Sequence, residues 1–175
     1  MKITSLKNIT EIPYLNEQGK LPEELQGKIG AYAVFNQEKE LQFVGYSREI
    51  YLSLKQHLVR QPENCYWLKY QTITHPSRTI LEEIRSSWIR ENGTIPPGNS
   101  TEEAKWTQPI DAKLSMTEGE QATYNNSDEL GKIKLLKQVA RKVEAEIKES
   151  LKRRELQEDI RFNPKIKEQG LLDLQ

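Results

Sequence analysis

The chain has little that ties it to an oxidising or a membrane environment. It contains a single cysteine, Cys65, in 175 residues, so no internal disulfide can form. This usage is typical of a reducing compartment, and we expect a cytoplasmic location. No apolar run approaches the roughly 20 residues that span a bilayer. Residues 1–10 alternate polar and apolar side chains and lack the apolar core of a signal peptide. The sequence therefore predicts a soluble protein with no membrane span.

The chain also lacks a net charge, because 26 Lys and Arg residues balance 26 Asp and Glu residues. A positive field over the whole molecule, which would collect nucleic acid, is excluded by this balance. Binding of DNA or RNA would have to rely on a local basic patch. Residues 27–99 contain nine basic against seven acidic residues, which gives only weak support for nucleic-acid binding there.

Apolar periodicity divides the remaining sequence into strands and helices. Residues 30–35, 41–46 and 66–73 are rich in β-forming residues, and a short polar turn joins the first two runs. Apolar residues at helical spacing predict helices over 50–58 and 79–92. We expect an α+β fold with a small three-stranded antiparallel sheet flanked by helices. The predicted parts are an N-terminal extension (1–26), this domain (27–99), an irregular linker or wrapping loop (100–127), a long helix (128–162) and a tail (163–175).

The long C-terminal helix has a narrow apolar seam. Its members recur at spacings of three and four residues: Leu136, Val139, Val143, Ile147 and Leu151. The expected stop is Asn163-Pro164. The helix either packs on its own domain or docks onto a protein partner through residues 128–160. In the preceding polar segment, Trp106 and Met116 are the residues expected to hold the chain in place.

Two tripeptides of the predicted hairpin suggest a family. Gly30-Ala31-Tyr32 and Phe43-Val44-Gly45 resemble the two motifs of the GIY-YIG endonuclease domain, over about residues 27–99. A closer resemblance is to a plant and cyanobacterial branch, where such a domain occurs alone or ahead of a monothiol glutaredoxin in a plastid protein. Residues 40–48 and the run Ile95-Pro96-Pro97-Gly98-Asn99 suggest this branch. The sequence contains no Cys-Gly-Phe-Ser-type glutaredoxin motif.

The resemblance implies a set of catalytic roles. A tyrosine, here Tyr32, would activate a water or relay its proton; the alternative is a core tyrosine whose hydroxyl is hydrogen-bonded. An arginine and one Mg²⁺ or Mn²⁺ ion would stabilise the charged phosphodiester transition state. The sequence departs from this set twice. The second motif tyrosine is Phe43, and the arginine position, eight residues after Gly45, is Ser53, which has neither charge nor fork.

Further candidates follow from position on the two predicted helices. His57 is a candidate proton relay, or else a histidine beside the last carbonyls of the first helix. Glu83 or Glu82 would hold the metal ion, and the alternative is that both are solvated acids near a helix N-terminus. Arg48 and Lys55 are candidate binding residues. At 3.6 residues per turn, the side chains of Arg48 and Lys55 would project from a different face of the helix than that of Ser53.

Asn99 is a third candidate binding residue, and Cys65 is a candidate redox-responsive thiol on a loop with some exposure. No basic neighbour in the sequence would activate that thiol, so an ordinary thiol is the alternative. Together these features predict a catalytically degenerate domain that binds nucleic acid or a protein and has little or no nuclease activity. Two alternatives stay open: a metal-dependent structure-specific endonuclease, and a scaffold or assembly factor that docks through its C-terminal helix. No cofactor is expected unless the domain is active.

Overall fold

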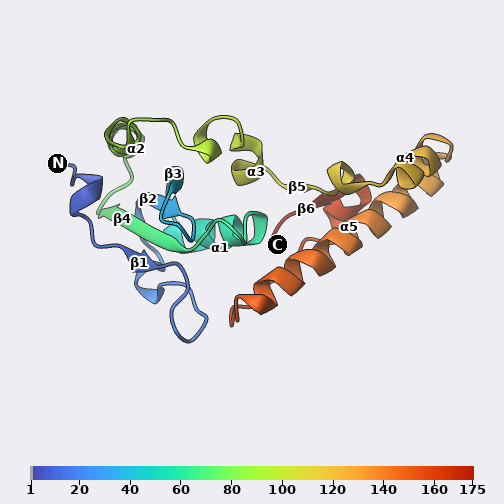
Figure 1. Cartoon of the computed structure of the whole chain (residues 1–175), viewed down its shortest axis with the longest axis horizontal. Helices are drawn as coiled ribbons and strands as arrows, with labels where there is room; N and C mark the ends of the chain where they lie inside the picture. The colour runs from blue at the N-terminus through green and yellow to red at the C-terminus, as the bar shows by residue number, and fades with distance from the viewer. Residues whose placement is uncertain (1) are drawn as a thin grey trace. The chain divides into compact units, whose positions relative to one another are not determined.

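The structure is a computed structural model that describes residues 2–175. The chain forms two compact units. The N-terminal unit comprises the residues up to Gln108 together with Leu156–Glu158, and the C-terminal unit comprises Pro109–Glu155 and Asp159–Gln175. The predicted α+β fold, with its antiparallel sheet and its long C-terminal helix, is confirmed (Figure 1).

The N-terminal unit contains a sheet with helices on both of its faces. Its elements in chain order are η1 (Leu6–Asn8), β1 (Ile12–Pro13), η2 (Glu23–Leu25), β2 (Ile29–Phe35), β3 (Leu41–Ser47), α1 (Ile50–Arg60), β4 (Trp67–Ile73), α2 (Arg78–Asn92), η3 (Pro97–Asn99) and α3 (Glu103–Thr107). Ser77 caps the start of α2 by accepting a hydrogen bond from the backbone N–H of Ile80, and Gly93 ends this helix in the left-handed conformation.

The sheet has one strand more than the sequence predicts. Its strands are antiparallel in the order β1-β4-β2-β3, and the three predicted strands are β2, β3 and β4. The additional strand, β1, pairs Ile12 with Leu68 and Pro13 with Trp67. A two-residue run that contains proline gives no strand pattern, yet proline is tolerated at a sheet edge because no ladder hydrogen bond is required there.

β2 is a central strand, so its alternate side chains are buried on two different faces. Ala31 and Ala33 belong to a core cluster with Ile84 and Trp88 of α2. Tyr32 lies on the opposite face, where α1 covers the sheet. The two faces therefore have different neighbours, which decides which candidate residues meet.

Residues 100–127, which were expected to be irregular, contain short elements. They include all of α3, β5 (Ile110–Asp111), η4 (Ala112–Ser115) and α4 (Glu118–Asn125). Thr117 and Glu120 form a capping box that starts α4, with hydrogen bonds of 3.0 and 3.1 Å between side chain and backbone. α4 has no buried residue, so no apolar stripe reveals it in the sequence. Trp106 is fully buried, as expected, whereas Met116 is only partly buried.

The C-terminal unit is built around α5 (Glu129–Arg153), the long helix in Figure 1. η4, η5 (Lys165–Gln169) and β6 (Leu171–Leu172) contact this helix, and β6 pairs with β5. The predicted seam is buried, with exposed fractions between 1% and 9%: Leu136, Val139, Val143, Ile147 and Leu151.

α5 ends before the predicted stop at Asn163-Pro164. Its last residue is Arg153, and Glu155 has a left-handed backbone with a φ of 57°. The apolar seam stops at Leu151, and a helix whose apolar face has ended loses the packing that stabilises it. Among residues 2–175, no helix is long and apolar enough to cross a membrane.

Candidate functional site

Tyr32 and His57 form the centre of the candidate site. Tyr32 lies on β2 and His57 on α1, and the Tyr32 hydroxyl lies 2.7 Å from Nε2 of His57, within hydrogen-bond distance. Their exposed fractions are 3% and 5%. The two residues that the family resemblance selects for proton transfer are thus brought together, in the protein core.

Aromatic rings enclose this pair. Phe43 of β3 stacks on Trp106 of α3, with ring centroids 5.2 Å apart and an interplanar angle of 4°. Both rings also contact the imidazole of His57, at centroid distances of 4.8 and 5.6 Å. Trp106 has no exposed surface. Phe43 and Trp106 therefore occupy the space beside His57.

Gly45 allows this close packing. A Cβ atom at position 45 would lie 2.5 Å from Cε2 of Phe43 and 2.9 Å from the Tyr32 hydroxyl oxygen. Both distances are shorter than ordinary van der Waals contact, so any side chain here would displace the rings. The motif glycine has a packing role, because it lets Phe43 and Tyr32 approach the strand.

Burial keeps both groups of the pair uncharged. Burial, together with the charge of Arg60, lowers the pKa of His57 to about 3. Burial also raises the pKa of Tyr32, while a hydrogen bond with Ser53 and the charge of Arg60 act in the opposite direction. At neutral pH His57 is a neutral imidazole and Tyr32 a neutral phenol. The neutral imidazole is the base form of histidine, but a pKa of about 3 makes His57 a weak base, and the neutral phenol of Tyr32 is not the phenolate that would activate a water.

Arg60 was missed by sequence reasoning. It lies on α1 three residues after His57, and its Nη1 donates a hydrogen bond of 3.0 Å to the carbonyl of Trp106. This bond joins the end of α1 to α3. The sequence signal for Arg60 was its spacing from His57, because residues three apart on a helix lie on the same face.

Ser53 stands at the position where the resemblance leads one to expect an arginine. The Ser53 hydroxyl donates a hydrogen bond of 2.8 Å to the hydroxyl of Ser47, and it also bonds Tyr32. These hydroxyls polarise one another but have no positive charge. A phosphodiester transition state would gain little stabilisation from them.

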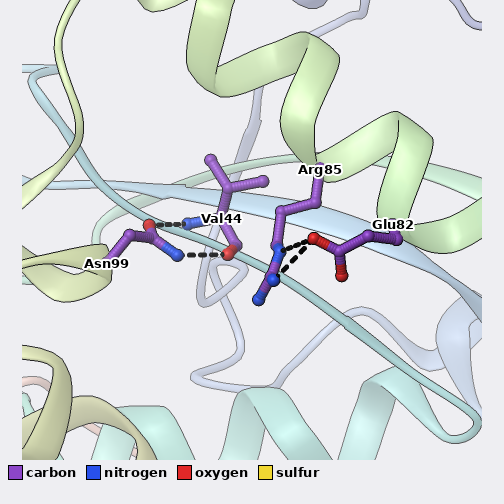
Figure 2. A network of polar contacts seen from close by, with 4 residues as sticks. All are labelled: Val44, Glu82, Arg85 and Asn99. Carbon is purple, nitrogen blue, oxygen red and sulfur yellow. Dashed lines mark hydrogen bonds and ion pairs between the residues drawn. The ribbon is translucent and has the colours of Figure 1, made fainter.

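The two candidate metal ligands lie on α2, and this helix packs on the other face of β2 from Tyr32. Oε1 of Glu82 accepts hydrogen bonds from Nε and Nη2 of Arg85, at 3.2 and 2.7 Å, as Figure 2 shows. The hydrogen bond from Arg85 lowers the pKa of Glu82. Glu83 lines a shallow surface pocket with Arg78 and Arg90. Within residues 2–175, no group of three or more His, Cys, Asp or Glu side chains is arranged to hold a metal ion.

A small pocket joins the α2 surface to the edge of β3. Its volume is about 280 Å³, and its lining includes Phe43, Glu82, Arg85 and Asn99. The guanidinium of Arg85 also lies over the ring of Tyr46, 5.3 Å from its centroid. The pocket therefore contains a paired acid and base beside one edge of the aromatic cluster.

The side-chain amide of Asn99, a candidate binding residue, forms hydrogen bonds through both its oxygen and its nitrogen. Its Oδ1 accepts from the backbone N–H of Val44 and its Nδ2 donates to the Val44 carbonyl, each at 2.8 Å (Figure 2). The amide thus makes the two hydrogen bonds that a neighbouring strand would make with Val44 at the edge of β3. A Cβ on the adjacent Gly98 would lie 2.6 Å from the carbonyl oxygen of Gln42, so η3 approaches this edge closely. The geometry favours a structural role for Asn99.

The other two candidate binding residues lie near the surface. Arg48 is exposed in the turn between β3 and α1, and Lys55 is half-buried on α1. The expectation of an exposed Cys65 is wrong, because this side chain has no exposed surface. Its thiol donates to the carbonyl of His57 at 3.6 Å, a position under the last turns of α1 that the flanking polar residues do not reveal.

Comparison with known proteins gives one similarity of note. The chain is 35% identical over 104 residues to the bifunctional monothiol glutaredoxin-S16, chloroplastic, of Arabidopsis thaliana. The match covers 56% of this chain and 34% of that protein, so the chain spans about a third of the length of this relative. The predicted similarity to a plastid monothiol glutaredoxin is confirmed over these residues. No model of a protein family matches the chain.

Proposed function

We propose that the chain is a binding module built on the scaffold of a GIY-YIG endonuclease, in which the former catalytic residues stabilise the fold. The observation that supports this proposal most is the burial of the Tyr32–His57 pair beneath Phe43 and Trp106. A general base must reach the proton that it removes, directly or through one water. The aromatic rings separate this pair from any substrate.

The electrostatics support the same proposal. Cleavage of a phosphodiester needs positive charge where the transition state is negative, from an arginine, a metal ion or both. Ser53 occupies the arginine position, and Glu82 is already bonded to Arg85. Mg²⁺ or Mn²⁺ would have Glu83 as its remaining predicted ligand. That glutamate lies on α2, the helix that packs against the face of the sheet opposite Tyr32.

A cleavage assay tests the proposal. Supercoiled plasmid and branched DNA are incubated with the purified chain and Mg²⁺ or Mn²⁺, and the wild type is compared with Tyr32→Phe and Glu83→Ala. We expect no cleavage above the buffer control for any of the three proteins. Thermal unfolding of each protein establishes that it is folded. Cleavage by the wild type that both substitutions abolish would instead establish the alternative, a metal-dependent endonuclease.

The scaffold alternative has one supporting observation of its own. Leu130 and Ile133, near the start of α5, are 78% and 36% exposed. Ile133 continues the direction of the buried seam, so a protein partner could extend that seam. A substitution of both residues by Gln tests this role through the loss of a stable complex with such a partner. A cleavage-inactive chain is compatible with this alternative as well.

A further inference from the structure

The charges of α5 are distributed unevenly, although those of the whole chain cancel. Between Glu129 and Arg153 the helix has eight Lys and Arg residues and four Glu residues. Five of the eight basic residues follow one flank of the helix, which we call the basic stripe: Lys134, Lys137, Arg141, Lys148 and Lys152. At 100° per residue, Lys134 and Lys152 project in the same direction, and the other three lie within about 60° of them. The stripe is about 27 Å long at 1.5 Å per residue.

The stripe is open to solvent and only partly neutralised. Lys134, Arg141 and Lys152 are exposed. Two acidic residues reach it: Glu168 lies 3.3 Å from the ammonium of Lys137, and Glu144 lies 3.1 Å from that of Lys148. The Lys137–Glu168 pair is exposed, and such pairs are weak, so a stronger anion can displace it. The side chain of Glu144 is only 16% exposed, so its pair with Lys148 is more firmly held.

η5 increases the positive charge beside the stripe. Lys167 is 2.5 Å from Glu144, so this carboxylate is shared between two ammonium groups. Lys165 is a second, exposed cation on the same element. The flank therefore has more positive than negative charge in a chain whose net charge is zero. A local patch of this kind is what nucleic-acid binding requires in the absence of a global field.

The apolar residues of α5 disfavour an anionic membrane as the partner. A helix that lies in a bilayer surface needs a continuous apolar face to bury there. The seam of α5 is already buried in the C-terminal unit. Leu130 and Ile133, near the start of α5, are exposed, but two residues within one turn do not make a continuous apolar face. The partner of the stripe should be an anion that stays in water.

We propose that the basic stripe binds the sugar–phosphate backbone of double-stranded nucleic acid. This inference rests on the proposed function, since it names the partner class of the binding module. A duplex is a stiff rod with one base pair per 3.4 Å, so a straight stripe of 27 Å faces about eight base pairs. Contacts to phosphates position a protein on the duplex without reading its sequence. Binding should therefore depend on salt and hardly on sequence.

Two double variants of the full chain separate the stripe from general charge effects. Arg141→Gln with Lys152→Gln removes two charges from the stripe. The matched control, Lys142→Gln with Arg153→Gln, removes one arginine and one lysine from the neighbouring positions. Helix geometry places these on the other side of the solvent-facing surface, about 100° away. All four residues are exposed, so neither variant disturbs the packing of the seam.

Fluorescence anisotropy with labelled duplex DNA and duplex RNA of two unrelated sequences measures the binding. The stripe variant should bind about tenfold more weakly at low salt, and the slope of log K against log salt should fall by about 2. The control variant should show a clearly smaller loss of affinity and a clearly smaller change in the salt slope. Equal losses in the two variants, or no binding of duplex by the wild type, would overturn the inference. So would binding to vesicles of phosphatidylserine and phosphatidylcholine in preference to duplex.

These outcomes are distinct from a failure of the proposed function. If the wild type binds no duplex and cleaves no nucleic acid, the stripe inference fails while a protein-binding module remains. If the wild type cleaves DNA through Tyr32, the proposed function fails. The comparison of the two double variants then still decides whether the stripe contacts the backbone.

Discussion

The Tyr32–His57 pair and the basic stripe of α5 are opposite arrangements of polar side chains. The pair lies in the core under aromatic rings, and both of its groups are uncharged at neutral pH. The stripe consists of charged groups that are open to water, and two of them, Lys137 and Lys148, pair with a glutamate. Buried groups of this kind affect stability, whereas exposed charges affect encounters with other molecules. Tyr32 and His57, which the resemblance selects for proton transfer, are therefore closed off from other molecules, whereas the basic stripe is open to them.

The strongest way to test this contrast is Trp106→Ala. The substitution removes a fully buried ring from its stack on Phe43 and leaves a cavity beside His57. We expect a loss of about 3–5 kcal/mol in the free energy of unfolding. Urea unfolding followed by the fluorescence of the remaining tryptophans, Trp67 and Trp88, measures it. Leu52→Ala, at a site that is 58% exposed, is the control and should cost under about 1 kcal/mol. Equal losses would show that α3 is not part of the core.

The pH dependence of stability tests the electrostatic half of the contrast. The folded protein holds the pKa of His57 at about 3, below the ordinary value of 6.5. Between these pH values the unfolded chain binds the extra proton, so stability is full above pH 6.5 and falls as the pH falls through this window. The slope approaches about 1.4 kcal/mol per pH unit.

The chain has a second histidine, His75, that is exposed and serves as the control for this experiment. Urea unfolding of His57→Gln and His75→Gln is compared between pH 7 and pH 5, above the ordinary titration range of carboxylates. We expect the slope to persist in His75→Gln and to disappear in His57→Gln. Identical slopes in both variants would mean that His57 is not buried as a neutral group.

The sequence predicted local features well, because alternation and helical spacing involve residues close together in the chain. It predicted β2, β3, β4, α1, α2 and the seam of α5 in this way. Contacts between distant residues were not predictable from one sequence. The stack of Phe43 on Trp106 and the bond from Arg60 to Trp106 depend on how α3 returns to the sheet. That return, which closes the candidate site, has no local signature.

A smaller effect is expected from Asn99, which links the core to the sheet edge. Asn99→Ala removes two hydrogen bonds to the backbone of Val44, each with a net value of about 0.5–1.5 kcal/mol. We expect a loss of about 1–3 kcal/mol and faster hydrogen exchange at the Val44 amide, both measurable in one NMR sample series. Asn92→Ala, at an exposed asparagine that bonds only Thr94 in the described contacts, should leave the Val44 amide unchanged. An unchanged exchange rate in Asn99→Ala would show that Asn99 does not stabilise the edge of β3. Asn99 would then remain a candidate binding residue.

The smallest effect should come from the surface pair of α2, which resembles the stripe more than the core. The side chains of Arg85 and Glu82 are 37% and 43% exposed, and such pairs contribute under about 1 kcal/mol. Arg85→Ala should therefore leave stability almost unchanged. It should raise the pKa of Glu82 toward its ordinary value, because the hydrogen bond from Arg85 is the main cause of the lowered pKa. An NMR titration of the Glu82 carboxyl measures this shift, and Arg78→Ala, which removes only a weaker charge effect, should shift it less. A stability loss as large as that of Trp106→Ala would place the pair with the core. An exposed ion pair on α2 would then affect stability as much as a buried ring does, which would contradict the contrast drawn above between buried and exposed groups.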